Sequence, residues 1–153
     1  MHSLELKVPP LVVLAFIATL MWFASQAAPA AGLQVPARHA IGLGLATVGV
    51  GTAVAGVVSF RIAKTSVNPL NPAAASALVT SGVYQLSRNP MYLGALILLI
   101  GWAAFLANAL GSILVPSFVL YMNRFQIGPE EKALTSLFTP GFTAYCVKVR
   151  RWL

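Results

Sequence analysis

Charged residues and cysteine are scarce in this sequence, and each shortage excludes a class of protein. Of the 153 residues, 8% are charged and 58% are hydrophobic, and the mean hydropathy is +0.82. A soluble domain carries about 25% charged residues, so this composition indicates an integral membrane protein. The single cysteine, Cys146, excludes an intrachain disulfide and offers no metal cluster.

Most of the few charged residues are basic, which gives a net charge of +7. They are scattered around long apolar runs, so membrane topology explains them better than nucleic-acid binding does. We therefore expect membrane lipids as partners, and neither nucleic acid nor a metal.

The apolar runs predict an all-α integral membrane protein, a single membrane domain over residues 1–153. Residues 10–28 and 40–62 each fit the roughly 20 residues that a bilayer core of about 30 Å requires. Residues 91–122 would make a helix of about 48 Å, which is too long for one crossing. This third run is therefore expected to fold back on itself.

The expected corner of this hairpin is Asn108-Ala109-Leu110-Gly111, where an amide and a glycine interrupt the apolar pattern. The hairpin arms are then residues 91–107 and 110–125, which brings the total to four transmembrane crossings. Arms of about 17 residues are at the lower limit for spanning, so whether they cross fully stays open.

Basic residues predict the orientation, because lysine and arginine accumulate on cytoplasmic loops. Four crossings leave only Arg38 on one face and place the loop of residues 64–89 and the tail of residues 127–153 on the other. We expect a multi-pass protein with both termini cytoplasmic. The cytoplasmic face then carries Lys7, Arg61, Lys64, Arg88, Arg124, Lys132, Lys148, Arg150 and Arg151.

Small residues recur every three or four positions along the second span, at Gly42, Ala46, Gly49, Ala53 and Gly56. This stripe predicts close packing against another helix. The paired glycines superficially resemble a dinucleotide-binding loop, but the G-x-G-x-x-G pattern is not completed and no strand precedes it.

The cytoplasmic loop has two features. Residues 67–72 repeat an Asn-Pro step, which predicts a stiff, non-helical strap that is either a connector or part of a binding site. Arg88-Asn89-Pro90-Met91-Tyr92 then places a cation, an amide and a phenol where the loop enters the third span. Free backbone amides at that helix start and the Arg88 guanidinium favour an anionic ligand. Alternatively, Arg88 snorkels to lipid headgroups, and Tyr84 and Tyr92 are interfacial aromatic residues.

The tail holds two of the three acidic residues, Glu130 and Glu131, in the first turn of a predicted short helix. Helix-dipole stabilisation is one explanation for them. The other is a binding role, because carboxylates beside a membrane are costly unless a cation or donor meets them. After Pro140-Gly141, residues 142–149 carry apolar side chains at helical spacing, and this segment is expected to lie on the membrane surface.

The order of these motifs identifies a resemblance. Ser81-Gly82-Val83-Tyr84 leads to Arg88-Asn89-Pro90-Met91-Tyr92-Leu93-Gly94, and Glu130-Glu131 follows with Leu134, Phe138, Tyr145 and Arg151. Over about the C-terminal 90 residues, the chain resembles the isoprenylcysteine carboxyl methyltransferase and phospholipid methyltransferase family. These are membrane enzymes that use S-adenosylmethionine.

The resemblance implies that S-adenosylmethionine sits in a cytoplasmic pocket, while a lipophilic small molecule or lipid enters from the bilayer. Arg88, with amides near Pro90, would hold the methionine carboxylate, and Glu130 or Glu131 would meet the ammonium or the ribose. Arg88, Asn89, Tyr92 and Glu131 are the expected catalytic residues. Cofactor contacts are expected from Tyr84, Ser87, Arg88, Asn89, Pro90, Tyr92, Leu93, Gly94, Glu130, Glu131, Leu134, Tyr145 and Arg151.

One position departs from the family pattern. Members that methylate prenylated cysteine carboxylates commonly have histidine where Asn89 stands, and asparagine cannot titrate. His39 is expected on the outer face and His2 in the N-terminal segment, so neither replaces it. The acceptor must therefore arrive already nucleophilic, as a carboxylate or thiolate, or a glutamate must act as the base.

Two other functions are compatible with the composition and the topology. One is a nonenzymatic permease or assembly protein, although the spans carry almost none of the ionisable residues that membrane pathways use. The other is a membrane reductase that uses a nicotinamide cofactor on a lipid double bond. Among methyl acceptors, a carboxylate, a thiolate and an amine all stay open.

Overall fold

The structure is a computed structural model that describes residues 5–65, 68 and 70–153. Over these residues the fold is all-helical, and the only β-type pairing is an isolated bridge between Gly32 and Asn108. The α-helices are α1 (Pro10–Ala27), α2 (Arg38–Ile62), α3 (Pro90–Leu106), α4 (Ala109–Ser112), α5 (Val115–Tyr121), α6 (Gly128–Phe138) and α7 (Gly141–Lys148). Shorter elements are η1 (Pro29–Ala31), η2 (Pro72–Ala74), η3 (Gly82–Gln85) and the π-helix η4 (Met122–Ile127).

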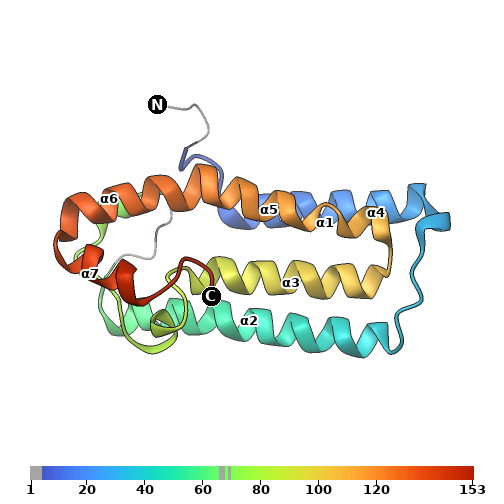
Figure 1. Cartoon of the computed structure of the whole chain (residues 1–153), viewed down its shortest axis with the longest axis horizontal. Coiled ribbons are helices and arrows are strands. Elements are labelled where there is room, and N and C mark those ends of the chain that lie inside the picture. Colours follow the sequence, from blue (N-terminus) through green and yellow to red (C-terminus); the bar gives the residue numbers. More distant parts are fainter. Residues whose placement is uncertain (1–4, 66–67, 69) are drawn as a thin grey trace.

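Four helical rods run side by side in alternating directions: α1, α2, α3, and a long rod made of α5, η4 and α6 (Figure 1). The loop between α2 and α3 lies at the same end of the bundle as α6, α7 and the C-terminal residues (Figure 1). We call this the polar end. The core between the rods is built by Val13, Ile17 and Met21 of α1, Tyr92 and Leu99 of α3, and Phe118, Met122 and Ile127 of the long rod.

The outward faces of α1 and α2 indicate a hydrocarbon surrounding. Both helices are long and apolar enough to cross a membrane, and α3 is a shorter apolar helix. Large apolar side chains such as Phe16, Phe23 and Val48 are exposed on their surfaces. Exposed aliphatic and aromatic side chains over such lengths suit lipid tails rather than water. Helices α1 and α2 are therefore candidate membrane spans, and all four crossings stay a prediction.

Glycines bring α2 and α3 into backbone contact, as the small-residue stripe predicted. A Cβ atom on Gly49 would lie 2.6 Å from the carbonyl oxygen of Gly94, and one on Gly42 would lie 3.0 Å from that of Gly101. At the polar end, a Cβ atom on Gly56 would lie 2.8 Å from the Met91 side chain. The α2 glycines are seven residues apart, so they form one line along the helix. We call this contact the glycine seam.

The predicted hairpin corner is confirmed. The α3 helix ends at Leu106, Ala107 adopts a left-handed conformation with φ 47°, and Asn108 caps α4. The Asn108 side chain accepts a hydrogen bond from the Gly111 amide at 3.1 Å and donates one to the Ala28 carbonyl at 2.9 Å. Asn108 thus satisfies backbone groups of two connections at the end opposite the polar end.

The fourth predicted span was expected to end at residue 125, but the long rod continues without a break to Phe138. Pro129 has no backbone N–H, so the carbonyl of Phe125 loses its i+4 donor. The Leu6 amide supplies that donor from outside, at 3.0 Å, and the rod widens into the π-helix just before this point. The proline therefore perturbs the rod locally and ties the N-terminal segment to it.

Candidate functional site

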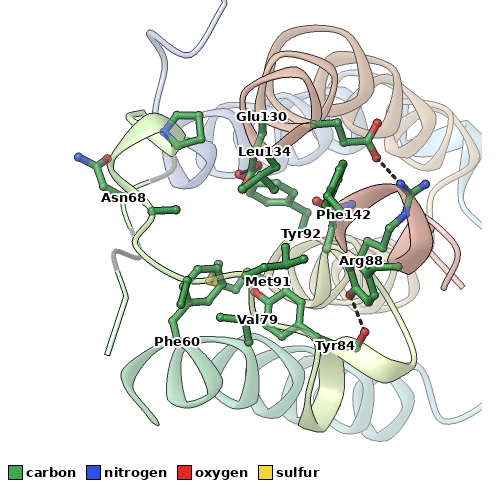
Figure 2. Close-up of a pocket in the computed structure, with 17 residues that line it drawn as sticks. Phe60, Asn68, Val79, Tyr84, Arg88, Met91, Tyr92, Glu130, Leu134 and Phe142 are labelled. Carbon is green, nitrogen blue, oxygen red and sulfur yellow. Dashed lines mark hydrogen bonds and ion pairs between the residues drawn. The ribbon is translucent and has the colours of Figure 1, made fainter. Parts of the chain in front are cut away.

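A pocket opens at the polar end, between the entrance of α3 and the helices α6 and α7 (Figure 2). The cavity itself has a volume of about 60 Å³, and the wider space that includes the open mouth amounts to about 790 Å³. The walls come from the end of α2, the connecting loop, η3, α3, α6 and α7. Its lining residues are Phe60, Asn68, Pro72, Ala75, Ala77, Leu78, Val79, Tyr84, Arg88, Asn89, Met91, Tyr92, Glu130, Glu131, Leu134, Phe142 and Tyr145.

Two arginines converge on the Glu131 carboxylate at one wall of the pocket. An Arg88 Nη1 atom lies 3.1 Å from Glu131 Oε1, and Arg151 binds both carboxylate oxygens, with distances of 3.2 Å and 2.5 Å. The Arg88 and Glu131 side chains are largely shielded from solvent, whereas the Arg151 side chain is 38% exposed. Removing Glu131 would therefore leave the shielded Arg88 charge without its partner.

The C-terminal residues are fastened to the start of α3. The amide of Arg88 donates to the Arg150 carbonyl at 3.0 Å, and Asn89 Nδ2 donates to the Arg151 carbonyl at 3.0 Å. The buried Ser87 hydroxyl accepts from the Asn89 amide at 3.1 Å and donates to the Arg151 carbonyl. These bonds fix the backbone from which Arg151 reaches Glu131.

Glu130 points into the pocket and has a different environment from Glu131 (Figure 2). Its Oε2 atom accepts a hydrogen bond from the Tyr92 hydroxyl at 3.1 Å. Among the described residues, no lysine or arginine forms an ion pair with it. Burial raises the pKa of the Glu130 carboxyl to about 7; the hydrogen bond from Tyr92 opposes this rise, and the neighbouring Glu131 carboxylate adds to it.

Helix α7 closes the pocket from the side. Phe142, Tyr145 and Val149 are buried against Leu78, Leu134, Phe138 and Cys146. The Tyr145 hydroxyl donates to the Tyr84 carbonyl at 2.6 Å, which joins α7 to η3. Burial raises the pKa of Tyr145 to about 12 and holds the Tyr84 pKa above its usual range as well. The tail was expected to lie with its apolar side on the membrane surface, but the connecting loop and α6 cover that side instead.

Residues 37–140 match the phospholipid methyltransferase family, which is about two thirds of the chain. The chain belongs to the phospholipid methyltransferase family. This match confirms the resemblance stated from the sequence. Membership of the family implies a membrane methyltransferase, without specifying the acceptor. A protein of Haemophilus influenzae (strain ATCC 51907 / DSM 11121 / KW20 / Rd), described as uncharacterized, is 44% identical over 63 residues, which cover 41% of this chain and 100% of that protein. No solved structure matches the chain.

In this methyltransferase, the structure brings together most residues that the sequence singled out. Eight of the predicted cofactor residues line the pocket: Tyr84, Arg88, Asn89, Tyr92, Glu130, Glu131, Leu134 and Tyr145. These residues come from four segments of the chain, yet all of them line the same pocket. The predicted catalytic residues Arg88, Asn89, Tyr92 and Glu131 are all among them.

Five predicted contacts lie outside the pocket, for identifiable reasons. Gly94 is used in the glycine seam against Gly49, and Pro90 contacts Gly56 of α2. Leu93 is buried on α3, next to the predicted positions that do line the pocket. Ser87 and Arg151 stand behind the lining: Ser87 hydrogen-bonds Asn89, and Arg151 holds Glu131.

Some lining residues were not predicted as site residues. Phe60 lies in the last turn of α2, and the short stretch from Pro72 to Val79 supplies small and aliphatic walls. Of the predicted strap, residues 67 and 69 lie outside the described residues, whereas Asn68 and Pro72 line the pocket. Phe142 was placed on the membrane surface from its spacing. An apolar side chain carries no chemical signal for a pocket, so only its neighbours in space reveal it.

The described part of the chain contains no group of three or more histidine, cysteine, aspartate or glutamate residues that could hold a metal ion. The groups available for chemistry are two carboxylates, two guanidiniums and three phenols. Such a set can bind a zwitterion, accept a proton and present aromatic faces to a cation.

Proposed function

We propose that the chain is an S-adenosylmethionine-dependent methyltransferase that acts on a lipophilic acceptor and binds its cofactor in the pocket at the polar end. The single observation that carries the proposal is the convergence of Arg88, Glu130 and Glu131 on one pocket in a member of a methyltransferase family.

The charges in the pocket suit the amino-acid part of the donor, which is a zwitterion. Arg88 and Glu131 form an ion pair at 3.1 Å. When the ligand enters, Arg88 can bind its carboxylate and Glu131 can bind its ammonium in place of this ion pair. Arg151 keeps Glu131 in place during that exchange. In addition, the Arg88 Nε atom is buried without a hydrogen-bond partner among the described residues. A ligand carboxylate would satisfy this donor, which otherwise costs about 1–3 kcal/mol.

The aromatic residues suit the remainder of the cofactor. Tyr84, Phe142 and Tyr145 line the pocket beside Arg88, and their faces can contact adenine and the positive sulfonium. The cofactor, when bound, supplies an electrophilic methyl group attached to sulfur. The protein then contributes by holding the acceptor in line with that methyl group and by excluding water.

The apolar part of the pocket suits an acceptor with a lipid tail. Phe60, Val79, Met91 and Leu134 supply aliphatic and aromatic surface next to the charged wall. We propose that the acceptor arrives from the bilayer and that the polar end is cytoplasmic. Basic residues gather at this end of the bundle: Arg61 lies in α2, Lys64 follows α2, Lys132 lies in α6 and Lys148 ends α7. The positive-inside rule associates such an accumulation with the cytoplasmic face.

Ligand-induced stabilisation tests the cofactor assignment. In detergent, S-adenosylmethionine at about 100 times its Kd is expected to add about 2.7 kcal/mol to the free energy of unfolding and to raise the melting temperature. Reduced nicotinamide cofactor is expected to leave it unchanged. The reverse pattern would move the assignment to a membrane reductase. Incubation with methyl-labelled donor and membrane lipid extract then identifies the acceptor from the labelled product.

A further inference from the structure

The two consecutive glutamates of α6 have separate partners. Glu131 is held by Arg88 and Arg151. Glu130, one residue earlier on the helix, is turned by about 100° relative to Glu131, and its carboxylate meets the Tyr92 hydroxyl inside the pocket. Glu131 is therefore already engaged with two cations. Glu130 is the carboxylate with capacity to take up a proton.

Other groups in the pocket are poor proton acceptors. Asn89 does not titrate, and its Nδ2 atom is engaged with the Arg151 carbonyl. The phenols of Tyr84 and Tyr145 have pKa values raised by burial, so they keep their protons at neutral pH. His39 contacts Phe105 at the opposite end of the bundle. Arginine has no acceptor atom.

We propose that Glu130 is the catalytic base that removes a proton from the methyl acceptor, whereas Glu131 serves binding. This inference rests on the proposed methyltransferase function and divides the roles of two residues within it. It extends the acceptors to groups that arrive protonated, such as an ammonium or a thiol, in addition to carboxylates that need no base.

Glu130, the acceptor and the methyl donor account for every proton and electron in the proposed step. For an ammonium acceptor, the Glu130 carboxylate takes one N–H proton, and the freed nitrogen lone pair attacks the methyl carbon of the sulfonium donor. A C–N bond forms while the C–S bond breaks, and its electron pair stays on sulfur as a neutral thioether. Glu130 leaves the step protonated and returns the proton to solvent at the pocket mouth.

The charged and titratable residues around Glu130 in the described pocket include Tyr92, Glu131, Tyr84 and Arg88. Tyr92 of α3 donates to it and favours the carboxylate, whereas burial and the Glu131 carboxylate favour the protonated acid, which puts the pKa at about 7. Tyr84 of η3 and Arg88 line the same pocket. A base that titrates near neutral pH combines a sufficient ionised fraction with enough basicity.

The test uses the full chain in detergent, S-adenosylmethionine, and a long-chain alkyl thiol as the acceptor. Wild-type kcat is expected to rise tenfold per pH unit up to about pH 7 and then level off. Glu130→Gln is expected to lower kcat by at least about hundredfold. Its residual rate should keep rising well above pH 7, since only free thiolate then reacts and the pKa of an alkyl thiol is higher than the roughly 8.5 of a cysteine side chain.

Two further measurements separate catalysis from cofactor binding. The Kd of S-adenosylmethionine for Glu130→Gln is expected to stay within about threefold of wild type. Formate is expected to raise the rate of Glu130→Ala by at least about tenfold, because it replaces the missing carboxylate in the vacated space. Glu5→Gln, which changes the glutamate that pairs with Arg124 outside the pocket, is the matched control and should keep the wild-type pH profile.

The inference is overturned if Glu130→Gln keeps the wild-type rate and pH profile. It is also overturned if the variant loses cofactor affinity by the same factor as kcat/KM, because Glu130 is then a cofactor ligand. Failure of the proposed function looks different. In that case wild-type protein itself shows neither stabilisation by S-adenosylmethionine nor methyl transfer, and the base assignment falls with it.

Discussion

The glycine seam and the polar end are both contacts between helices, but backbone atoms form the first and charged side chains form the second. Along the seam, Gly49 and Gly94 bring two backbones together with no side chain between them. At the polar end, Arg88, Glu131 and Arg151 connect α3, α6 and the C-terminus through long side chains. The seam offers no side-chain group to a ligand, whereas Arg88 and Glu131 at the polar end also line the pocket.

The two regions meet at the start of α3. The last seam glycine, Gly56, lies against Pro90 and Met91, immediately after Arg88 and Asn89. A rigid backbone contact thus fixes where the functional motif begins, and the hydrogen bonds of the polar end arrange the charges around it. The chemical groups proposed to bind a ligand are thus held on a closely packed pair of helices.

The largest effect is expected in the seam. Gly49→Leu places side-chain atoms where the Gly94 backbone already lies, so α2 and α3 must separate, at a cost above about 3 kcal/mol. We expect loss of monodisperse protein on size-exclusion chromatography. Gly51→Leu is the matched control, because no atom lies within 4 Å of a Cβ atom at that position. An equally stable Gly49→Leu protein would show that the seam does not hold the helices.

The next effect concerns the charges of the polar end. Arg88→Glu and Glu131→Lys are each expected to weaken S-adenosylmethionine binding by at least about hundredfold, because like charges then face the ligand and the remaining partners. Titration calorimetry in detergent measures the Kd. Arg124→Glu alters an arginine that also pairs with a glutamate, Glu5, but is half-exposed and lies outside the pocket, and it should keep the affinity. Retained binding in both site variants would place the cofactor elsewhere.

A smaller effect is expected from the amide that connects the motif to the tail. Asn89→Ala removes the hydrogen bond to the Arg151 carbonyl, so Arg151 and Glu131 lose alignment and kcat falls by about ten- to hundredfold. The pH profile of the rate should keep its shape, because an amide does not titrate. A steep new pH dependence in the variant would mean that Asn89 does more than position its neighbours.

The smallest expected effect is a pH-dependent change in stability, which arises at the polar end and not in the seam. The Glu130 pKa is raised to about 7 in the folded protein, so the unfolded chain loses this proton first as pH rises from about 4.5. Glu130 therefore destabilises the fold progressively between about pH 4.5 and 7, by about 1–2 kcal/mol after allowance for partial exposure. Melting temperatures of Glu130→Gln and wild type should agree at low pH, diverge between about pH 4.5 and 7 with the variant higher, and stay apart by a constant amount above pH 7. Parallel curves would contradict the shifted pKa.

Several elements were predictable because their signals are local. The second span, its glycine stripe and the Asn108 corner follow from residue type and spacing within short windows, and all three agree with the structure. The motif at Arg88–Tyr92 and the Glu130-Glu131 pair were recognised for a related reason. Charged residues next to apolar runs are costly unless they have a partner, so their presence indicates one.

Other features depended on neighbours distant in the sequence. The tail helix α7 has an apolar face that suits a bilayer surface or a protein surface equally well, and only the position of Leu78 and Leu134 decides for protein. Where Pro129 interrupts the hydrogen bonding of the rod, the Phe125 carbonyl accepts from the amide of Leu6, more than a hundred residues away. Neither outcome is encoded in the local pattern.

The amino-acid sequence alone determined that this chain is a helical membrane protein of a methyltransferase family whose scarce charges gather around the entrance to its third helix, because hydropathy and charge are properties of residue type. The tertiary structure decided which glutamate is held by two arginines and which one meets Tyr92 in the pocket. Consecutive residues on a helix point in different directions, so the partners of Glu130 and Glu131 depend on where α3 and the C-terminal residues pack.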